Sequence, residues 1–354
     1  MGREHAVNRK EKKKEEDGTG FFWTYFFILQ IIVAIILICF STFMINDFVS
    51  NIKQHNPNYS WPKITELIPS LFILPFIIIL KTGIEYCSKG FVEHCLANKY
   101  KHPKNEEYKK LGMIYRHKLA RHIYKIVFYV GLTIFGYVAL LDLPYFPKSL
   151  LGNGYMSNIL NKGFPDCYFY ERTPLFNLYY NINLAYFLSD AIFLFIMERQ
   201  SDFVNMILHH LCTISLILFS FLVNYSNVGV LVLFLHIESD ILLHATRFLI
   251  QTDNSQILVG FVGLLFTFNF VYMRQYVLGE IIYTMYIYGT WKWVLLEKTL
   301  WWFLVFLYIM HLRWSYILVS KAIQMLFCKT KISDDINYNK LIHENKNKDY
   351  KKMN

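Results

Sequence analysis

The sequence predicts an all-α protein, a polytopic transmembrane helical bundle of about eight spans. Three observations predict this fold class. Hydrophobic residues make up 55% of the 354 residues, and aromatic residues make up 18%. Apolar runs close to the length that crosses a bilayer recur along the whole chain. The Lys and Arg residues, which give a net charge of +10, are concentrated at the two ends and in one loop.

The apolar runs place the expected spans and divide the chain into four regions. The spans cover residues 21–45, 64–80, 122–141, 176–197, 203–223, 228–250, 257–278 and 300–326. The second contains Pro69 and Pro75, which predict a short, kinked helix. The four regions are a basic tail (1–20), two spans with a basic loop (21–110), a part with six spans (111–327) and an Asn/Lys-rich tail (328–354).

The charge distribution predicts the orientation. An even number of spans puts both termini on one side, and Lys and Arg mark the cytosolic side of a membrane protein. Both tails and the loop between the second and third spans are Lys-rich, so both termini are expected in the cytosol. The loop after the first span then faces the lumen, where Asn58 begins an N-x-S acceptor triplet for glycosylation.

The tails allow two further interpretations. Basic tails also occur in proteins that bind nucleic acid, but topology explains these tails more simply, and we expect no nucleic-acid partner. The chain ends in KKMN, which resembles the dilysine retrieval signal of endoplasmic-reticulum membrane proteins. The expected location is therefore the endoplasmic-reticulum membrane.

Ionisable residues lie inside the fifth and sixth spans. His209 and His210 are adjacent in the fifth, while His236, Asp240 and His244 follow at intervals of four and share one helix face in the sixth. A hairpin turning near residue 225 would bring Asp240 and His244 to the depth of the histidine pair, about 9 Å inside the cytosolic end. Interhelical hydrogen bonds would explain such residues structurally. Their number at one depth favours a functional site.

Two chemistries fit this set of residues. A histidine can act as a general base, with Asp240 holding its tautomer and stabilising its cation. Alternatively, histidine and carboxylate side chains can bind zinc or iron. The double histidine stands alone, and the six cysteines include no C-x-x-C pair. Acid–base chemistry is therefore favoured, and no metal is expected.

Residues 199–248 resemble the signature segment of the ceramide synthases, within the TLC domain. The family pattern M-x-x-H-H-x-x-T and its continuation match at Asp202, Phe203, Met206, His209, His210, Thr213, Ser220, Asn224, Gly229, His236, Ser239 and Asp240. The resemblance extends over residues 111–327. The chain departs from the pattern at Phe221, at Asn227, at Ile237, where the family has an acidic site residue, and at His244, where it has Glu.

The resemblance implies transfer of a fatty acyl chain from acyl-CoA to the amine of a sphingoid base, forming (dihydro)ceramide. It implies that His209 or His210 deprotonates the amine or carries the acyl group, that Asp240 holds the charged partner, and that His236 assists proton transfer. Substrate binding or support is implied for Met206, Thr213, Ser220, Asn224 and His244. No bound cofactor is implied, because acyl-CoA is a co-substrate.

The same resemblance gives finer expectations and an alternative. The basic loop 99–121 is a candidate for attracting CoA phosphates, and residues 283–298 are the expected determinant of acyl-chain length. The expected partners are lipid substrates and the membrane, with a homodimer left open. The alternative function is that of a non-enzymatic TLC protein that assists membrane-protein translocation or senses lipid. The translocation protein resembles this chain at His244 but lacks the double histidine.

Overall fold

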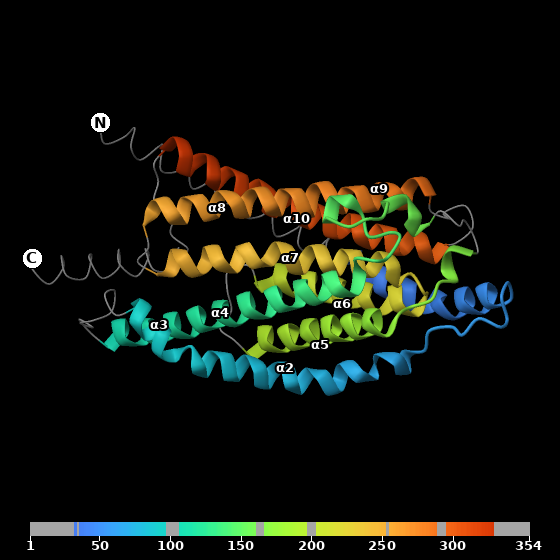
Figure 1. The fold of residues 1–354 in the computed structure, drawn as a ribbon, viewed down its shortest axis with the longest axis horizontal. Coiled ribbons are helices and arrows are strands. Elements are labelled where there is room, and N and C mark those ends of the chain that lie inside the picture. Colours follow the sequence, from blue (N-terminus) through green and yellow to red (C-terminus); the bar gives the residue numbers. More distant parts are fainter. Residues whose placement is uncertain are drawn as a thin grey trace, which may run out of the picture. The chain divides into compact units, whose positions relative to one another are not determined.

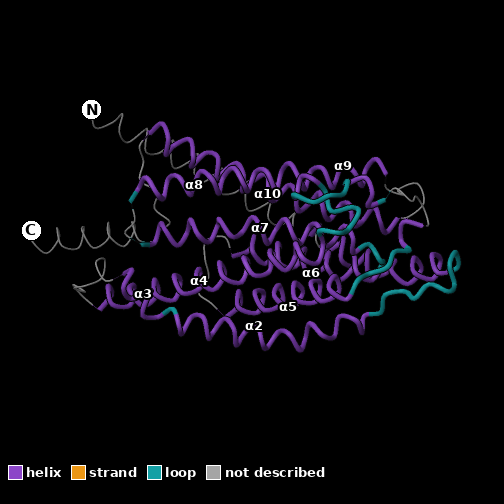
Figure 2. Tube along the Cα trace, in the orientation of Figure 1, coloured by secondary structure: helices purple, strands orange, loops and turns teal. Residues whose placement is uncertain are grey.

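The computed structural model describes residues 32–33, 35–96, 106–160, 166–196, 203–252, 255–288 and 295–328. Helices dominate this part of the chain (Figure 1), and Figure 2 shows no strand within it. The described residues include an isolated β-bridge between Pro147 and Gly154. The prediction of an all-α fold is confirmed. The two terminal tails and Lys99, Lys101 and Lys104 of the basic loop lie outside the described residues.

Long helices connected by short turns make up the fold. After a first helix over Ile35–Lys53, they are η1 (Ile64–Leu67), α2 (Ile68–Cys87), α3 (Lys89–Leu96), α4 (Glu106–Leu140), η2 (Lys148–Leu150), η3 (Met156–Ile159), η4 (Asp166–Tyr168), α5 (Pro174–Ile196), α6 (Phe203–Leu222), α7 (Ser226–Gln251), α8 (Gln256–Val271), η5 (Tyr272–Val277), α9 (Leu278–Tyr288) and α10 (Leu295–Cys328). The short η elements are 3-10 turns except η5, which is a π-helix.

Seven helical stretches in the described part are long and apolar enough to cross a membrane. They are Ile35–Lys53, Ile64–Cys87, Tyr115–Leu140, Pro174–Ile196, Ser226–Gln251, Gln256–Tyr288 and Leu296–Phe327. The apolar part of α6, Met206–Leu222, is shorter. The protein is therefore a multi-pass membrane protein, and the expected count of about eight spans is approximate.

Several helices extend beyond the expected spans. The first helix reaches Lys53 instead of ending at residue 45, and α4 begins at Glu106 within the stretch expected to be a loop. The expected seventh span continues through η5 and α9 to Tyr288. Hydropathy locates the part of a helix that lipid can cover, whereas backbone hydrogen bonds continue for as long as the chain stays helical.

Two compact units share these helices, and their sequences are interleaved. Unit 1 comprises Met1–Leu74, Tyr155–Val230 and Ile281–Leu307. Unit 2 comprises Pro75–Gly154, Leu231–Glu280 and Tyr308–Asn354.

In unit 1, α5 packs against α6 and the start of α7 comes close to both. The hydroxyl of Tyr180 on α5 donates a hydrogen bond to the Ile217 carbonyl of α6 (2.8 Å) and lies 2.7 Å from Ser220 Oγ. Gly229, in the first turn of α7, allows this approach. A Cβ at that position would lie 2.8 Å from Ser220 Oγ and 2.9 Å from Tyr180 Oη.

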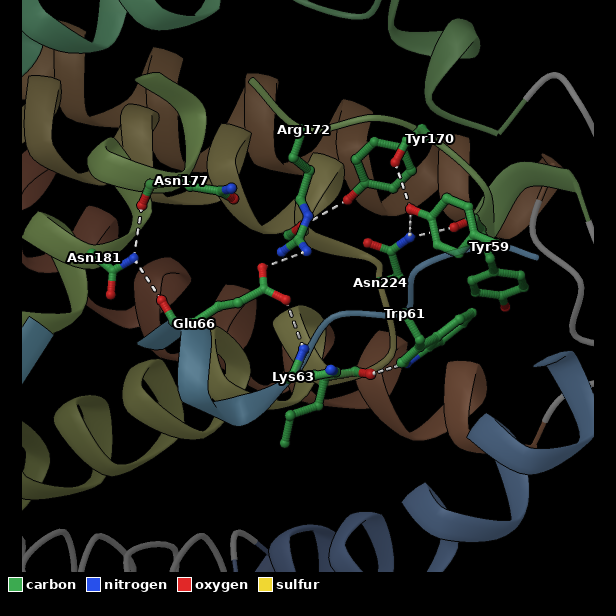
Figure 3. Close-up of polar contacts among 12 residues, drawn as sticks. Tyr59, Trp61, Lys63, Glu66, Tyr170, Arg172, Asn177, Asn181 and Asn224 are labelled. Atoms are coloured by element: carbon green, nitrogen blue, oxygen red, sulfur yellow. Dashed lines mark hydrogen bonds and ion pairs between the residues drawn. The ribbon is translucent and has the colours of Figure 1, made fainter. Parts of the chain in front are cut away.

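The turn after α6 is held by a polar network that Figure 3 shows in close-up. Asn224 adopts a left-handed backbone conformation (φ 56°), which Asn tolerates better than most residues. Its side-chain amide donates to Tyr59 Oη (2.7 Å) and to the Tyr168 carbonyl. Nearby, Arg172 pairs with Glu66 at 3.0 Å and covers the ring of Phe221 at 4.4 Å. These contacts tie the segment before α2 to the α6–α7 turn.

In unit 2, the short helix α3 covers one side of α4. Their shared apolar cluster contains Val92, Leu96, Tyr115, Leu119 and Ala120. The rings of Phe91 and Phe248 stack with centroids 6.2 Å apart, which adds the end of α7 to the same cluster. The early turns of α4 are therefore packed on their apolar side.

Candidate active site

In unit 1, the paired histidines lie on α6 beside a carboxylate from α5. His209 and His210 are 7% and 5% exposed. Nε2 of His210 lies 3.5 Å from Oδ2 of Asp190, and the ring of Phe187 flanks His210 at 6.3 Å. The two imidazole rings are 5.7 Å apart and inclined by 66°, because successive residues on a helix point about 100° apart. Asp190 thus places a carboxylate beside His210.

This arrangement separates the roles of the two histidines. An imidazole beside a carboxylate can hold or release a proton while the carboxylate fixes its orientation and stabilises its cation. Within α6, the hydroxyl of Thr213 donates to the His209 carbonyl at 2.8 Å. Thr213 therefore supports the backbone that carries His209.

In unit 2, Arg274 of η5 connects α7 with α10. Its guanidinium donates to Asp240 Oδ1, to Ser239 Oγ (2.9 Å) and to the His236 carbonyl (3.2 Å). It also lies 3.2 Å from Nε2 of His311 on α10. Arg274 is 3% exposed, and a cation so deeply buried requires compensating partners. Asp240 supplies the opposite charge.

The hydrogen bonds also define the tautomers of two histidines in unit 2. Nδ1 of His236 lies 2.6 Å from the Val232 carbonyl, and a carbonyl can only accept, so Nδ1 carries the proton. In the neutral ring, Nε2 of His236 is then the basic atom. Since Arg274 can only donate, Nε2 of His311 accepts from it. The two rings lie 4.9 Å apart.

The π-helix η5 supplies Arg274 to this cluster. A π-helical turn has more residues than an α-helical turn, and such turns occur frequently at functional sites. The rings of Tyr272 and Tyr276 stack at 5.4 Å on this turn. Phe270, just before it, lies 5.0 Å from the Arg274 guanidinium. The π-helical turn therefore carries an arginine whose guanidinium has several hydrogen-bond partners.

The predicted site residues fall into separate groups. His209 and His210 belong to unit 1, whereas His236 and Asp240 meet around Arg274 in unit 2. The expected match in depth between these two groups stays a prediction. His244 instead contacts His122 of α4, with 3.0 Å between the two Nδ1 atoms.

The supporting residues on α6 and its following turn also separate. Met206 is half-buried in the early part of α6. Ser220 contacts Tyr180, and Asn224 belongs to the turn network. Both lie ten or more positions beyond His210, about 15 Å along a helix, so they stabilise the α6–α7 connection. Asp202 lies outside the described residues.

The departures from the family pattern occupy packed surroundings. Ile237 is 1% exposed and belongs to the apolar core. The adjacent Glu238 accepts a hydrogen bond from Asn269 of α8 at 3.1 Å. Glu238 therefore has its own structural partner.

Sequence reasoning missed four residues of these clusters: Asp190, His122, Arg274 and His311. Asp190, Arg274 and His311 are ionisable residues within apolar helical runs, and that signal alone marks a functional candidate in a membrane protein. His122 stands among Lys and Arg at the start of its expected span, where this signal is weaker. Among the residues described, no three His, Cys, Asp or Glu side chains are grouped to hold a metal ion. The expectation that no metal or cofactor is bound stays a prediction.

Comparison with known proteins gives consistent results. Residues 118–320, more than half of the chain, match the TLC domain. Ceramide synthase 5 of Homo sapiens is 31% identical over 161 residues, covering 44% of this chain and 40% of the relative. Sphingosine N-acyltransferase lag1 of Schizosaccharomyces pombe is 32% identical over 130 residues (37% and 33%). Ceramide synthase 3 of Homo sapiens is 26% identical over 232 residues (62% and 56%). The chain thus spans less than two thirds of each of these relatives.

Proposed function

The chain belongs to the TLC-domain family, and on this premise we propose that it is a ceramide synthase. It would transfer a fatty acyl chain from acyl-CoA to the amine of a sphingoid base, giving (dihydro)ceramide and free CoA. The observation that most supports this proposal is the buried double histidine with Asp190 beside His210. The names of the relatives, ceramide synthase and sphingosine N-acyltransferase, support the same reaction. They give no support to the alternative of a non-enzymatic translocation or lipid-sensing protein.

The proposal assigns two routes to His209 or His210. In the first, the histidine removes a proton from the amine as the amine nitrogen attacks the thioester carbonyl carbon, and the CoA thiolate leaves. In the second, the histidine nitrogen attacks the thioester and releases CoA. The amine then takes the acyl group from the acyl-imidazole. Accumulation of a covalent acyl-protein under single-turnover conditions distinguishes the second route from the first.

The remaining site residues have assisting roles in the proposal. Asp190 positions His210. Nε2 of His236 is the basic atom available for proton transfer, because Nδ1 is committed to the Val232 carbonyl. Asp240, fixed by Arg274, provides negative charge. No bound cofactor is needed, because acyl-CoA brings its own activated carbonyl.

The finer cellular assignments are also part of the proposal. We place the protein in the endoplasmic-reticulum membrane, with both Lys-rich tails on the cytosolic side. The substrates are lipids reached from within the membrane, and no nucleic acid is involved. A homodimer is the assembly to test.

Acyl transfer itself is the test. The full chain is expressed in membranes that lack endogenous activity, and a labelled sphingoid base is supplied with a panel of acyl-CoA lengths. We expect labelled amide from the unmodified protein and a loss of about 10²-fold or more in His209→Ala or His210→Ala. The matched control is His55→Ala, an exposed histidine of unit 1, which should leave turnover unchanged. Folded protein that gives no amide with any acyl-CoA would refute the proposal.

A further inference from the structure

In unit 2, two buried histidines join the middle of α4 to the last turns of α7. Nδ1 of His122 and Nδ1 of His244 are 3.0 Å apart, and the Gln251 side-chain amide lies 3.2 Å from Nε2 of His122. All three side chains are buried. These contacts fix the middle of α4 against the end of α7.

Four cationic side chains surround this histidine pair. On α4, Lys118 and Lys125 lie four and three residues from His122 and share its helix face, and on α7 Arg247 lies three residues from His244 and shares its face. Arg121 is adjacent to His122 in sequence and points about 100° away from it. All four cations are half-buried. The charged side chains that interact electrostatically with His122 are Arg247, Lys125, Arg121 and Lys118, and all four are positive.

A topology signal does not explain this arrangement. Charges that only set orientation act in water and need no particular packing. Here the side of α4 that carries Leu119 and Ala120 is covered by α3, and Lys118 lies over the ring of Tyr115, in the same apolar cluster, at 5.6 Å. A surface lined by one sign of charge also attracts and concentrates ions of the opposite sign.

The chemistry of the side chains selects the kind of anion. Arginine presents a planar fork of donors that matches phosphate oxygens, and lysine adds a compact positive charge. At the centre, the contact between His122 and His244 holds together the two helices that carry these cations. A phosphorylated ligand with more than one phosphate would engage both helices.

We propose that this cluster binds phosphate groups, supplied either by the CoA part of an acyl donor or by an anionic phospholipid headgroup. The residues assigned to it are Lys118, Arg121, His122, Lys125, His244 and Arg247. With CoA as the source, the assignment deepens the proposed acyl transfer and rests on it. It replaces the expected loop 99–121 with helical residues, because Arg121 lies on α4 and the cluster continues to Lys125 and Arg247.

The first experiment needs no substitution. The full-length protein in nanodiscs of neutral lipid is titrated with CoA, and with dephospho-CoA, which lacks the 3′-phosphate. We expect dephospho-CoA to bind about tenfold more weakly, and CoA binding to weaken as salt rises. A second arm uses nanodiscs that contain phosphatidic acid. If the lipid headgroup is the ligand, the protein retains phosphatidic acid through purification in detergent and CoA does not displace it.

Substitutions then locate the site. Lys125→Gln and Arg247→Gln are each expected to weaken binding of the responding probe by about tenfold. Lys321→Gln, which removes an exposed lysine of α10 in the same unit, is the matched control and should bind like the unmodified protein. Thermal unfolding without ligand identifies any variant that fails to fold, and His244→Glu, which introduces a negative charge, provides a second test of the same prediction.

The outcomes separate this inference from the proposed function. Phosphate-dependent CoA binding that is lost in the cluster variants supports the inference, even when no amide is formed. Amide formation with unchanged affinity for the responding probe in folded Lys125→Gln and Arg247→Gln overturns the inference and leaves the proposed function standing. Absence of binding in both arms overturns it as well.

Discussion

Arg274 donates a hydrogen bond to Asp240, so the buried cation of η5 is paired with the carboxylate of α7 in unit 2. Removing one member of a buried ion pair is costly, because the remaining charge stays buried without its partner. The same guanidinium holds Ser239 and the His236 carbonyl. Arg274 thereby fixes two of the residues assigned to catalysis.

Removing Arg274 alone should destabilise the protein more than removing Arg274 and Asp240 together. We expect Arg274→Met to lower the free energy of unfolding by about 3 kcal/mol, measured by denaturant or thermal unfolding in detergent. The double variant Arg274→Met with Asp240→Leu should recover much of that loss, because no unpaired charge remains. Acyl transfer should stay low in both variants. Equal destabilisation in the single and double variants would show that the two residues are not coupled.

Asp190 should affect turnover through His210. Asp190→Asn keeps the size of the side chain but removes the charge beside the imidazole, so we expect kcat to fall by about 10²-fold with KM for acyl-CoA little changed. Asp190→Glu keeps the charge and should recover part of the rate. A change in KM alone, or a Glu variant no better than the Asn variant, would assign Asp190 a purely structural role.

Gly229 should tolerate no side chain. Because a Cβ there would lie 2.8 Å from Ser220 Oγ, Gly229→Ala is expected to cost about 1–3 kcal/mol of unfolding free energy. Gly131 on α4 is the matched control, since nothing lies within 4 Å of its Cβ position. Gly131→Ala should leave stability unchanged or raise it by up to about 1 kcal/mol. Thermal unfolding of the two variants side by side makes the comparison.

Cys167 should react slowly with thiol reagents in the folded protein. Burial, reinforced by the charge of Glu297, raises the pKa of this thiol from 9.0 to about 12. The reactive thiolate is therefore scarce at pH 8, and stability from the protonated thiol is lost only as pH rises from about 9 towards 12. In a variant that keeps Cys167 alone, maleimide labelling should be about 10³-fold slower when folded than in denaturing detergent. Similar rates in the two states would contradict this burial.

Hydropathy predicted the fold class correctly because a bilayer requires long apolar helices. It could not predict helix ends. α4 begins at Glu106, since the Lys-rich stretch before the span is compatible with helix although it is too polar for lipid. It also could not reveal η5, because a π-helical turn depends on how α8 and α9 pack and has no sequence period of its own.

The site was predictable only where neighbouring residues carried the signal. His209 and His210 are adjacent, and His236 and Asp240 share a helix face, so spacing identified them. Asp190 and Arg274 are isolated polar residues on other helices, and contacts between helices do not follow from spacing within one helix. His244 shows the same limit: it shares the face of Asp240 by spacing, yet it contacts His122 on α4.

The π-helix η5 also limits how this span can be redesigned or aligned. One π-helical turn is equivalent to a single extra residue inserted in a regular α-helix. Deleting one residue between Tyr272 and Val277 would let the span become regular, and the side chains after the deletion would keep about the same orientation relative to α8, because the wide turn absorbs the extra residue. A homologue with a one-residue gap at this position would therefore keep the same hydropathy and lose the placement of Arg274.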